Sequence, residues 1–242
     1  MTTNVYGINP VLEALRAGRV TAIRARRGGA RIEEISVLAA EQGVAVRWVE
    51  ASELDRAARG GVHQGVVADL GAARDYSVSE LVHSAAGVPL IVVLDGIEDP
   101  QNVGAIIRTA DAAGVDGIIQ QTRHAAALGG AVAKASAGAL AHARVARVVN
   151  IARAIEELKQ EGVWTVGLAG EALQSYDAID LTVPVAFVFG GEGPGLRRLV
   201  RERCDWLVSI PMRGKVASLN VSAAAAVALF EAVRQRRAAG LG

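Results

Sequence analysis

The chain has 242 residues, 51% of them apolar, and a formal net charge of +1, so it can bury the core of one large domain or of a small and a medium domain. Its single cysteine, Cys204, excludes an intrachain disulfide and a cysteine cluster around a metal. The N-terminus lacks a signal-peptide pattern, and the uncharged stretch from Val216 to Phe230 is too short to cross a bilayer. We therefore expect a soluble, cytoplasmic protein without a membrane segment.

Positive charge is unevenly distributed, although the small net charge gives no sign of a nucleic-acid partner. Six arginines and no acid lie between Glu13 and Glu33, namely Arg16, Arg19, Arg24, Arg26, Arg27 and Arg31. A second basic run near the C-terminus contains Arg234, Arg236 and Arg237. Guanidinium groups suit phosphate binding and base stacking, but a solvated arginine-rich face explains these runs equally well at this point.

The first third of the chain predicts a compact alternation of helices and strands. Asn9 followed by Pro10 is an N-cap and first-turn signal for a helix through Leu15. Apolar residues at helical spacing predict a second helix over Arg31 to Gln42, ended by Gly43. The other expected elements are strands at Thr21 to Arg26, Val44 to Val49 and Val66 to Leu70, and a short helix capped by Ser52.

A domain boundary is predicted after this alternation. The stretch from Gly71 to Ser77 is small and polar, and no strong periodicity returns before Val88. We therefore divide the chain into a domain of residues 1–72, a linker of residues 73–87 and a domain of residues 88–242.

The second domain shows a regular alternation of strand and helix patterns. The expected strands are Leu90 to Leu94, Gly117 to Gln120, Val163 to Leu168, Val185 to Phe189 and Trp206 to Ile210. The expected helices begin near Pro100, Asn150, Gly195 and Ser218. This alternation predicts an α/β fold with a mostly parallel sheet that has helices on both faces.

The position of the glycine-rich turn separates two classes of cofactor site. A dinucleotide-binding fold carries Gly-x-Gly-x-x-Gly after its first strand, but here residues 95–102 read Asp-Gly-Ile-Glu-Asp-Pro-Gln-Asn. The glycine-rich turn comes late instead, at Gly190 to Gly195 after the strand that ends at Phe189. This disfavours an oxidoreductase on a dinucleotide fold and places a cofactor site in the C-terminal half.

The first segment that carries chemistry runs from Asp99 to Arg108. Pro100 predicts the start of a helix that carries Asn102 near its N-terminus and Arg108 less than two turns further on. An amide and a guanidinium at the carboxyl edge of a sheet can hold a phosphate or a sugar. The alternative is an exposed arginine on a surface helix.

Two further segments follow the late strands. In the glycine-rich turn, backbone amides can approach a ligand closely, and Glu192 would be costly there without a partner, unless the turn is simply exposed. The segment from Ile210 to Ser222 places Ser218, Asn220 and Ser222 at the start of the last helix. Helix capping by Ser218 accounts for one of these three polar residues but not for all of them.

Together the three segments resemble the motifs of the SpoU family of RNA ribose 2'-O-methyltransferases, within the SPOUT superfamily. The residues that carry the resemblance are Asn102, Gly104 and Arg108, then Gly191, Glu192 and Gly193, then Ser218 to Ser222. The resemblance begins at Tyr6-Gly7, includes His63-Gln64-Gly65 and extends over essentially the whole chain. It is greatest to the bacterial branch that modifies a guanosine in 23S ribosomal RNA.

The resemblance implies a fold and a cofactor that the residue pattern alone does not give. The implied fold is a SPOUT-type parallel sheet with a trefoil knot near the C-terminus, preceded by a small L30e-like RNA-binding domain. The implied cofactor is S-adenosylmethionine, held in a bent shape largely by backbone groups. The corresponding positions in this sequence are Gly190, Gly191, Ile210, Met212, Ser218 and Leu219.

The resemblance also implies roles for side chains. Family proposals make the residue at Arg108 the proton acceptor, but a guanidinium keeps its proton at neutral pH, so we expect it to clamp a phosphate and stabilise the developing alkoxide. None of the four histidines lies in the three motifs. We expect Asn102 to orient the ribose or Arg108, Ser218 and Asn220 to hold the third loop and the substrate, and Glu192 to anchor the knot or reach a dimer partner.

The expected partners are RNA, most simply 23S ribosomal RNA, and a second copy of the chain. RNA would meet the arginine-rich N-terminal domain and the catalytic cleft, and no histidine, cysteine or carboxylate cluster has the spacing of a metal site. At Ala141 and Arg144 the chain departs from relatives, which carry an acid and a proline there, so the target nucleotide stays open. The alternatives are a transfer RNA 2'-O-methyltransferase and a non-catalytic RNA-binding or ribosome-assembly protein of the same fold.

Overall fold

The computed structural model describes residues 3–71, 74–193 and 195–241, so Pro194 and the expected boundary between residues 72 and 73 lie outside the described residues. Contacts group the chain into two compact units. The first comprises Met1–Arg74, Val103–Arg108 and Ala127–Ala143, and the second comprises Asp75–Asn102, Thr109–Ala126 and Arg144–Gly242.

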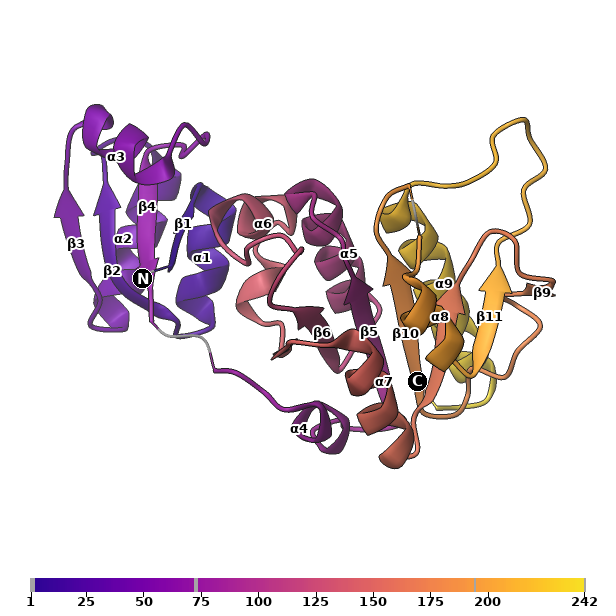
Figure 1. Ribbon diagram of the computed structural model, residues 1–242. Helices are drawn as coiled ribbons and strands as arrows, with labels where there is room; N and C mark the ends of the chain where they lie inside the picture. The colour runs from indigo at the N-terminus through magenta and orange to yellow at the C-terminus, as the bar shows by residue number, and fades with distance from the viewer. Residues whose placement is uncertain (1–2, 72–73, 194, 242) are drawn as a thin grey trace. The chain divides into compact units, whose positions relative to one another are not determined.

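The first unit contains a four-stranded sheet with helices packed against it (Figure 1). Its strands are β1 (Thr3–Tyr6), β2 (Val20–Ala25), β3 (Ala45–Trp48) and β4 (Val66–Leu70). The sheet order is β1-β4-β2-β3, in which β4 is antiparallel to β1 and β2, and β3 is parallel to β2. The helices are α1 (Ile8–Arg16), α2 (Ala30–Glu41), α3 (Ala51–Ala58), α6 (Gly130–Ala135) and the 3-10 helix η1 (Ala139–Ala141).

Helix α1 begins two residues earlier than expected, at Ile8, and Asn9 is not its N-cap. The cap position is occupied by Gly7, whose φ of 94° is accessible mainly to glycine. Because glycine has no side chain to accept a bond from the first turn, Gln64 supplies the acceptor: its Oε1 receives the N–H of Ile8 at 3.0 Å. The start of α1 thus depends on a residue 56 positions away.

The second unit contains a seven-stranded sheet in the order β7-β6-β5-β10-β8-β11-β9, with every pair parallel. Its strands are β5 (Leu90–Asp95), β6 (Gly117–Gln121), β7 (Val145–Val148), β8 (Trp164–Leu168), β9 (Gln174–Ser175), β10 (Val185–Gly190) and β11 (Trp206–Ser209). The helices are α4 (Val78–His83), α7 (Ile151–Gln160), α8 (Arg198–Arg203) and α9 (Val221–Ala238), and α5 (Pro100–Ala112) contributes residues to both units.

The central strands of this sheet are apolar without alternation because helices cover both faces. All six residues of β5 are buried. Alternate residues of β5 and β10 pack in one cluster with α4, α7 and α8. Helix α9 lies across the opposite face (Figure 1). Its buried residues recur at helical spacing, at Ala225, Ala228, Leu229 and Ala232. The α/β class and the parallel sheet expected from the sequence are confirmed.

Several helix starts, and the expected linker, differ from the predictions made from short local sequence signals. Glu50, not Ser52, precedes α3, and Asn220, not Ser218, caps α9. Helix α8 begins at Arg198 rather than near Gly195. The expected linker of residues 73–87 contains α4, which Ser77 and Glu80 start with a capping box.

None of the helices in the described part of the chain is long and apolar enough to cross a membrane.

The C-terminal basic run does not form one exposed patch. Arg234 pairs with Glu231 at 2.6 Å. Arg236 is buried, and its guanidinium donates hydrogen bonds of 2.6 to 3.0 Å to four backbone carbonyls, those of Val88, Pro89, Leu181 and Val183. Burial lowers the pKa of Arg236. This side chain therefore ties the last helix to the loops that precede β5 and β10.

Replacing Arg236 with methionine should lower the free energy of unfolding by about 3 kcal/mol, because buried carbonyls lose their charged donor. Urea denaturation would measure the change. Arg237→Met is the matched control, since Arg237 lies next in the same helix turn and is exposed. Equal effects of the two substitutions would contradict a structural role specific to Arg236.

Candidate functional site

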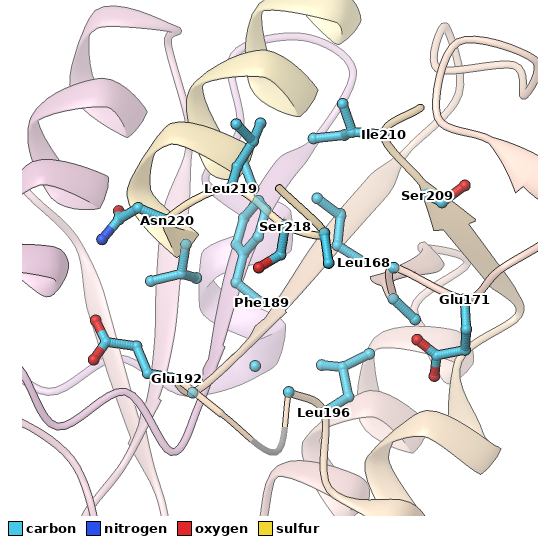
Figure 2. Close-up of a pocket in the computed structure, with 18 of the residues that line it drawn as sticks. Leu168, Glu171, Phe189, Glu192, Leu196, Ser209, Ile210, Ser218, Leu219 and Asn220 are labelled. Carbon is cyan, nitrogen blue, oxygen red and sulfur yellow. The ribbon is translucent and has the colours of Figure 1, made fainter. Parts of the chain in front are cut away.

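A cavity of about 600 Å³ opens at the carboxyl ends of β8, β10 and β11, where Leu168, Phe189 and Ser209 line it (Figure 2). This is the usual place for a ligand in an open parallel sheet, because the strand order reverses there: β5 to β7 extend one way, and β8 and β11 lie beyond β10 on the other. The volume falls within the range of small-molecule sites.

The glycine-rich turn after β10 forms one wall of the cavity. Gly191 pairs with Gly195 across the turn, and the N–H of Gly195 donates to the Gly191 carbonyl at 3.1 Å. A Cβ on Gly190 would overlap the backbone of Gly195, and one on Gly191 would overlap the carbonyl oxygen of Gly96. Both positions therefore require glycine for backbone packing.

Asp95 anchors the exit of this turn. The Asp95 carboxylate is fully buried. It accepts hydrogen bonds from the backbone N–H of Arg197 at 2.9 Å and from the side-chain Nε of Arg197 at 2.6 Å. Arg197 also donates to Gln121 at the end of β6. The ends of β5 and β6 thereby fix the residue that precedes α8.

A directed chain of hydrogen bonds joins the three predicted motifs. The Oδ1 of Asn220 accepts the N–H of Ser222 at 2.8 Å as the cap of α9. The Asn220 amide nitrogen donates to Oδ1 of Asn102 at 2.9 Å, and the Asn102 amide nitrogen donates to the carboxylate of Glu192. A backbone N–H can only donate, so the bond from Ser222 identifies the oxygen of the Asn220 amide. The Asn220 nitrogen must then face Asn102, and this bond in turn identifies the oxygen of the Asn102 amide.

The structure brings most of the predicted residues together at the cavity. All six expected cofactor positions line it, namely Gly190, Gly191, Ile210, Met212, Ser218 and Leu219. Glu192 and Asn220 also line it, and the buried Asn102 is bonded to both.

Arg108 stands apart from this group. It is exposed on α5 and is not among the residues that line the cavity. Its helix segment, Val103–Arg108, belongs by contacts to the first unit. No partner for its guanidinium occurs among residues 3–71, 74–193 and 195–241, so the group is available to an external ligand.

Sequence reasoning missed the wall that follows β8. Leu168 and Glu171 line the cavity (Figure 2). Gly170 also lines it, and Arg201 of α8 pairs with Glu171. The available signal was position alone: these residues lie at the end of an expected strand or just after it, at the same sheet edge as the glycine-rich turn.

Two other kinds of chemistry find no support. Burial raises the pKa of Cys204 to about 12, so its thiol stays protonated and is a poor nucleophile at neutral pH. Within the described ranges no group of histidine, cysteine and carboxylate side chains could hold a metal ion.

The arginines of the first unit are largely paired within the fold. Arg24 contacts Asp69 at 2.5 Å, and Arg31 contacts Glu34 at 2.9 Å. Asp69, which is distant in sequence, and Glu34, one turn further along α2, thus neutralise two of the clustered arginines. Arg26 is exposed, and the guanidinium of exposed Arg27 lies 5.1 Å from the ring centre of Trp48.

Comparisons with known families agree with this arrangement. Residues 89–230 match the model of the SpoU rRNA Methylase family, and residues 4–76 match that for RNA 2'-O ribose methyltransferase substrate binding. The chain belongs to the SpoU rRNA methylase family, a family of RNA ribose 2'-O-methyltransferases that use S-adenosylmethionine.

Individual relatives cover nearly the whole chain. It is 45% identical to the 23S rRNA (guanosine-2'-O-)-methyltransferase RlmB of Pseudomonas putida, over 96% of each chain. It is 42% identical to a TrmH family tRNA/rRNA methyltransferase of Bacillus subtilis, over 98% of this chain and 97% of the relative. The SpoU methyltransferase AviRb from Streptomyces viridochromogenes, solved in complex with AdoMet, superposes with a TM-score of 0.82 at 27% identity, over 97% of this chain and 90% of that one.

The cavity fits the chemistry of S-adenosylmethionine, which has a flat purine at one end and a charged amino acid at the other. Leu168, Leu196, Ile210 and Leu219 offer apolar surface, while the glycine-rich turn offers backbone groups unobstructed by side chains (Figure 2). Leu219 lines this cavity and is 39% exposed. A bound ligand would cover it.

Replacing Leu219 with alanine should weaken S-adenosylmethionine binding about tenfold while leaving stability nearly unchanged, because this side chain becomes buried only when the ligand binds. Calorimetric titration and thermal melting would measure the two quantities. Val216→Ala is the matched control, since Val216 lies in the same loop, is 67% exposed and does not line the cavity. Unchanged affinity in the Leu219 variant would place the ligand elsewhere.

Proposed function

We propose that this chain transfers a methyl group from S-adenosylmethionine to the ribose 2'-hydroxyl of a guanosine in 23S ribosomal RNA. The RlmB relatives, at 43–45% identity over almost the full length, carry this activity in their names. A cytoplasmic location belongs to the same proposal, because it follows from a ribosomal RNA substrate.

One observation carries the proposal: the bonds from Asn220 to Asn102 and from Asn102 to Glu192 join all three motifs at the rim of one cavity. These residues are 118 and 90 positions apart. A fold that merely retained an ancestral shape for RNA binding would not need a buried amide that holds a cavity rim together.

Backbone groups of the glycine-rich turn and of the loop after β11 would hold the cofactor. Gly190, Gly191, Ile210, Met212 and Leu219 are the proposed contacts, with Ser218 at the edge facing the substrate. When bound, S-adenosylmethionine supplies an activated methyl group on a sulfonium leaving group.

Arg108 is the proposed catalytic residue. The ribose hydroxyl is a weak nucleophile while protonated, and arginine is a poor base. Its planar fork can hold a phosphate of the RNA and stabilise negative charge as it develops on the 2'-oxygen. Such an interaction accelerates transfer because it strengthens in the transition state.

The remaining predicted residues act through position. Asn102 sets the distance between the glycine-rich turn and the start of α9, because its amide contacts both. Glu192 accepts the last hydrogen bond of the chain, from Asn102, and this bond holds the glycine-rich turn in place. Ser218 and Asn220 hold the third loop where the nucleotide is to lie.

The knot, the L30e-like domain and the domain limits belong to the same proposal. Strand order supports a knot, because β10 inserts between β5 and β8 and the chain then passes to β11 before α9 returns to β10. The family matches at residues 4–76 and 89–230 support an RNA-binding domain of residues 1–72, a linker of residues 73–87 and a methyltransferase domain of residues 88–242.

The purified protein should transfer labelled methyl from S-adenosylmethionine to 23S RNA transcripts without added metal, at a single guanosine 2'-hydroxyl mapped by resistance to alkaline cleavage. Transfer to transfer RNA instead would establish the alternative substrate. Cofactor and RNA binding without any transfer would establish a non-catalytic RNA-binding protein and refute the proposal.

Arg108→Ala should leave cofactor affinity nearly unchanged but cut methyl transfer severely, because the lost contact acts on the transition state. Lysine should rescue little, since it keeps the charge and loses the fork. Calorimetry and single-turnover transfer assays would measure the two effects. A parallel loss of cofactor affinity would contradict the proposed role.

We further propose that the enzyme is a homodimer whose sites combine Arg108 of one protomer with the cavity of its partner. Mixing Arg108→Ala subunits with Gly191→Val subunits should then restore activity, because one site of each mixed dimer carries neither defect. Isolated heterodimers with two different affinity tags provide the measurement. Inactive heterodimers would show that each subunit holds a complete site.

Charge reversal at Arg26 and Arg27 should weaken RNA binding and flatten its logarithmic salt dependence by about 1 to 2 units, because each lost phosphate contact removes counterion release. Filter binding at several salt concentrations would measure the slope. Arg153→Glu is the control for charge alone, since Arg153 lies on α7 and pairs with Glu157. An unaltered slope would show that Arg26 and Arg27 are solvent-exposed surface residues that do not contact the RNA phosphates.

A further inference from the structure

The Tyr6-Gly7 and His63-Gln64-Gly65 motifs have no part in the cavity, yet both lie at one closely packed place in the first unit. The Tyr6 ring fits between Gly61 and Gly130, and a Cβ at either glycine would overlap the ring. Gly130 is the first residue of α6, so Tyr6 holds the start of that helix against β1.

The segment that follows α6 is held by α1. A Cβ on Gly138 would lie 2.5 Å from Cγ of Glu13, and the carboxylate of Glu13 contacts Nε2 of His142 at 3.0 Å. Arg19 donates to the carbonyls of Leu140 and Ala141 at 3.3 and 3.4 Å. Gln64 in turn holds the start of α1. Both ends of residues 130–142 are thus fixed by the N-terminal sheet and its first helix.

The same segment packs against the turn that carries Arg108. A Cβ on Gly104 would overlap the side chain of Ala135 at the end of α6. Gly104 and Arg108 are four residues apart on α5 and therefore share one face of the helix. A displacement of α6 would therefore displace the turn of α5 that carries Arg108.

We propose that Tyr6 is a positioning residue for methyl transfer: its ring seats α6 so that α6 holds the Arg108 turn in place. The inference rests on the proposed role of Arg108 as the catalytic arginine. It gives the Tyr6-Gly7 motif a function: the family-matched substrate-binding region, residues 4–76, fixes the catalytic arginine through α6. The substrate-binding region, residues 4–76, and Arg108 then keep a fixed position relative to each other.

The test is a double-mutant cycle between Tyr6 and Arg108, measured as single-turnover methyl transfer at saturating RNA. Tyr6→Ala should slow transfer about tenfold to a hundredfold, as a misplacement of about 1 Å does, with cofactor affinity unchanged. Tyr6→Phe should retain the rate, because the ring does the packing. In the Arg108→Ala background, Tyr6→Ala should cost little further, because its effect passes through Arg108.

Gly130→Ala provides a second route that does not remove the tyrosine, since the added methyl must displace the ring. It should reproduce the slow transfer, and Gly87→Ala, where a Cβ meets nothing within 4 Å, should not. Hydrogen exchange at Val103–Arg108 should quicken in Tyr6→Ala and Gly130→Ala and stay unchanged in Gly87→Ala.

Three results would overturn the inference: an equal loss in both Arg108 backgrounds, an effect confined to the KM for RNA, or unchanged exchange at the Arg108 turn. Failure of the proposed function is distinguishable from these results, because the unsubstituted protein would then transfer no methyl group.

Discussion

The buried amide of Asn102 is the contact on which the arrangement of the cavity rim depends. An amide both donates and accepts, so one side chain can join a carboxylate on one loop to another amide on the next. Here the donor side faces Glu192 and the acceptor side faces Asn220. Aspartate in its place would lose the donor and set two carboxylates against each other. Alanine would remove both bonds and with them the link between the two loops, because Glu192 and Asn220 are exposed and would bond water instead.

The direction of this chain is set by ordinary helix physics. The first N–H groups of α9 need an acceptor, and Asn220 supplies it with its Oδ1. The amide nitrogen of Asn220 can then only point away from the helix, toward Asn102. A capping interaction, which contributes about 1 kcal/mol on its own, thus also decides which way the amides of Asn220 and Asn102 face.

Sequence patterns predicted the α/β class, the parallel strands and the motif residues that line the cavity, because apolar runs and glycine-rich turns are local signals. They missed β1, β7 and α6, which are short and whose stability comes from neighbours. Strand β1 is the clearest case, since its Tyr6 packs on two glycines, one 55 and the other 124 positions away. The cap of α1 escaped prediction for the same reason: Asn9 has the better local signal, but Gln64 reaches the helix start in space. The position of β10 between β5 and β8 likewise has no local signal.

Charge pairing within the fold explains why a run of arginines in the sequence is a weak guide to a surface that binds an external anion. Arg24, Arg31 and Arg236 are each held by acids or carbonyls of the fold, so their charge is already used. Arg108 is exposed and has no such partner within the described ranges. A cation kept at the end of a closely packed turn, without an internal acid, retains its full capacity for an external anion. Because RNA presents phosphates at regular intervals, we expect the arginines without an internal partner, rather than the total count of arginines, to determine where its backbone binds.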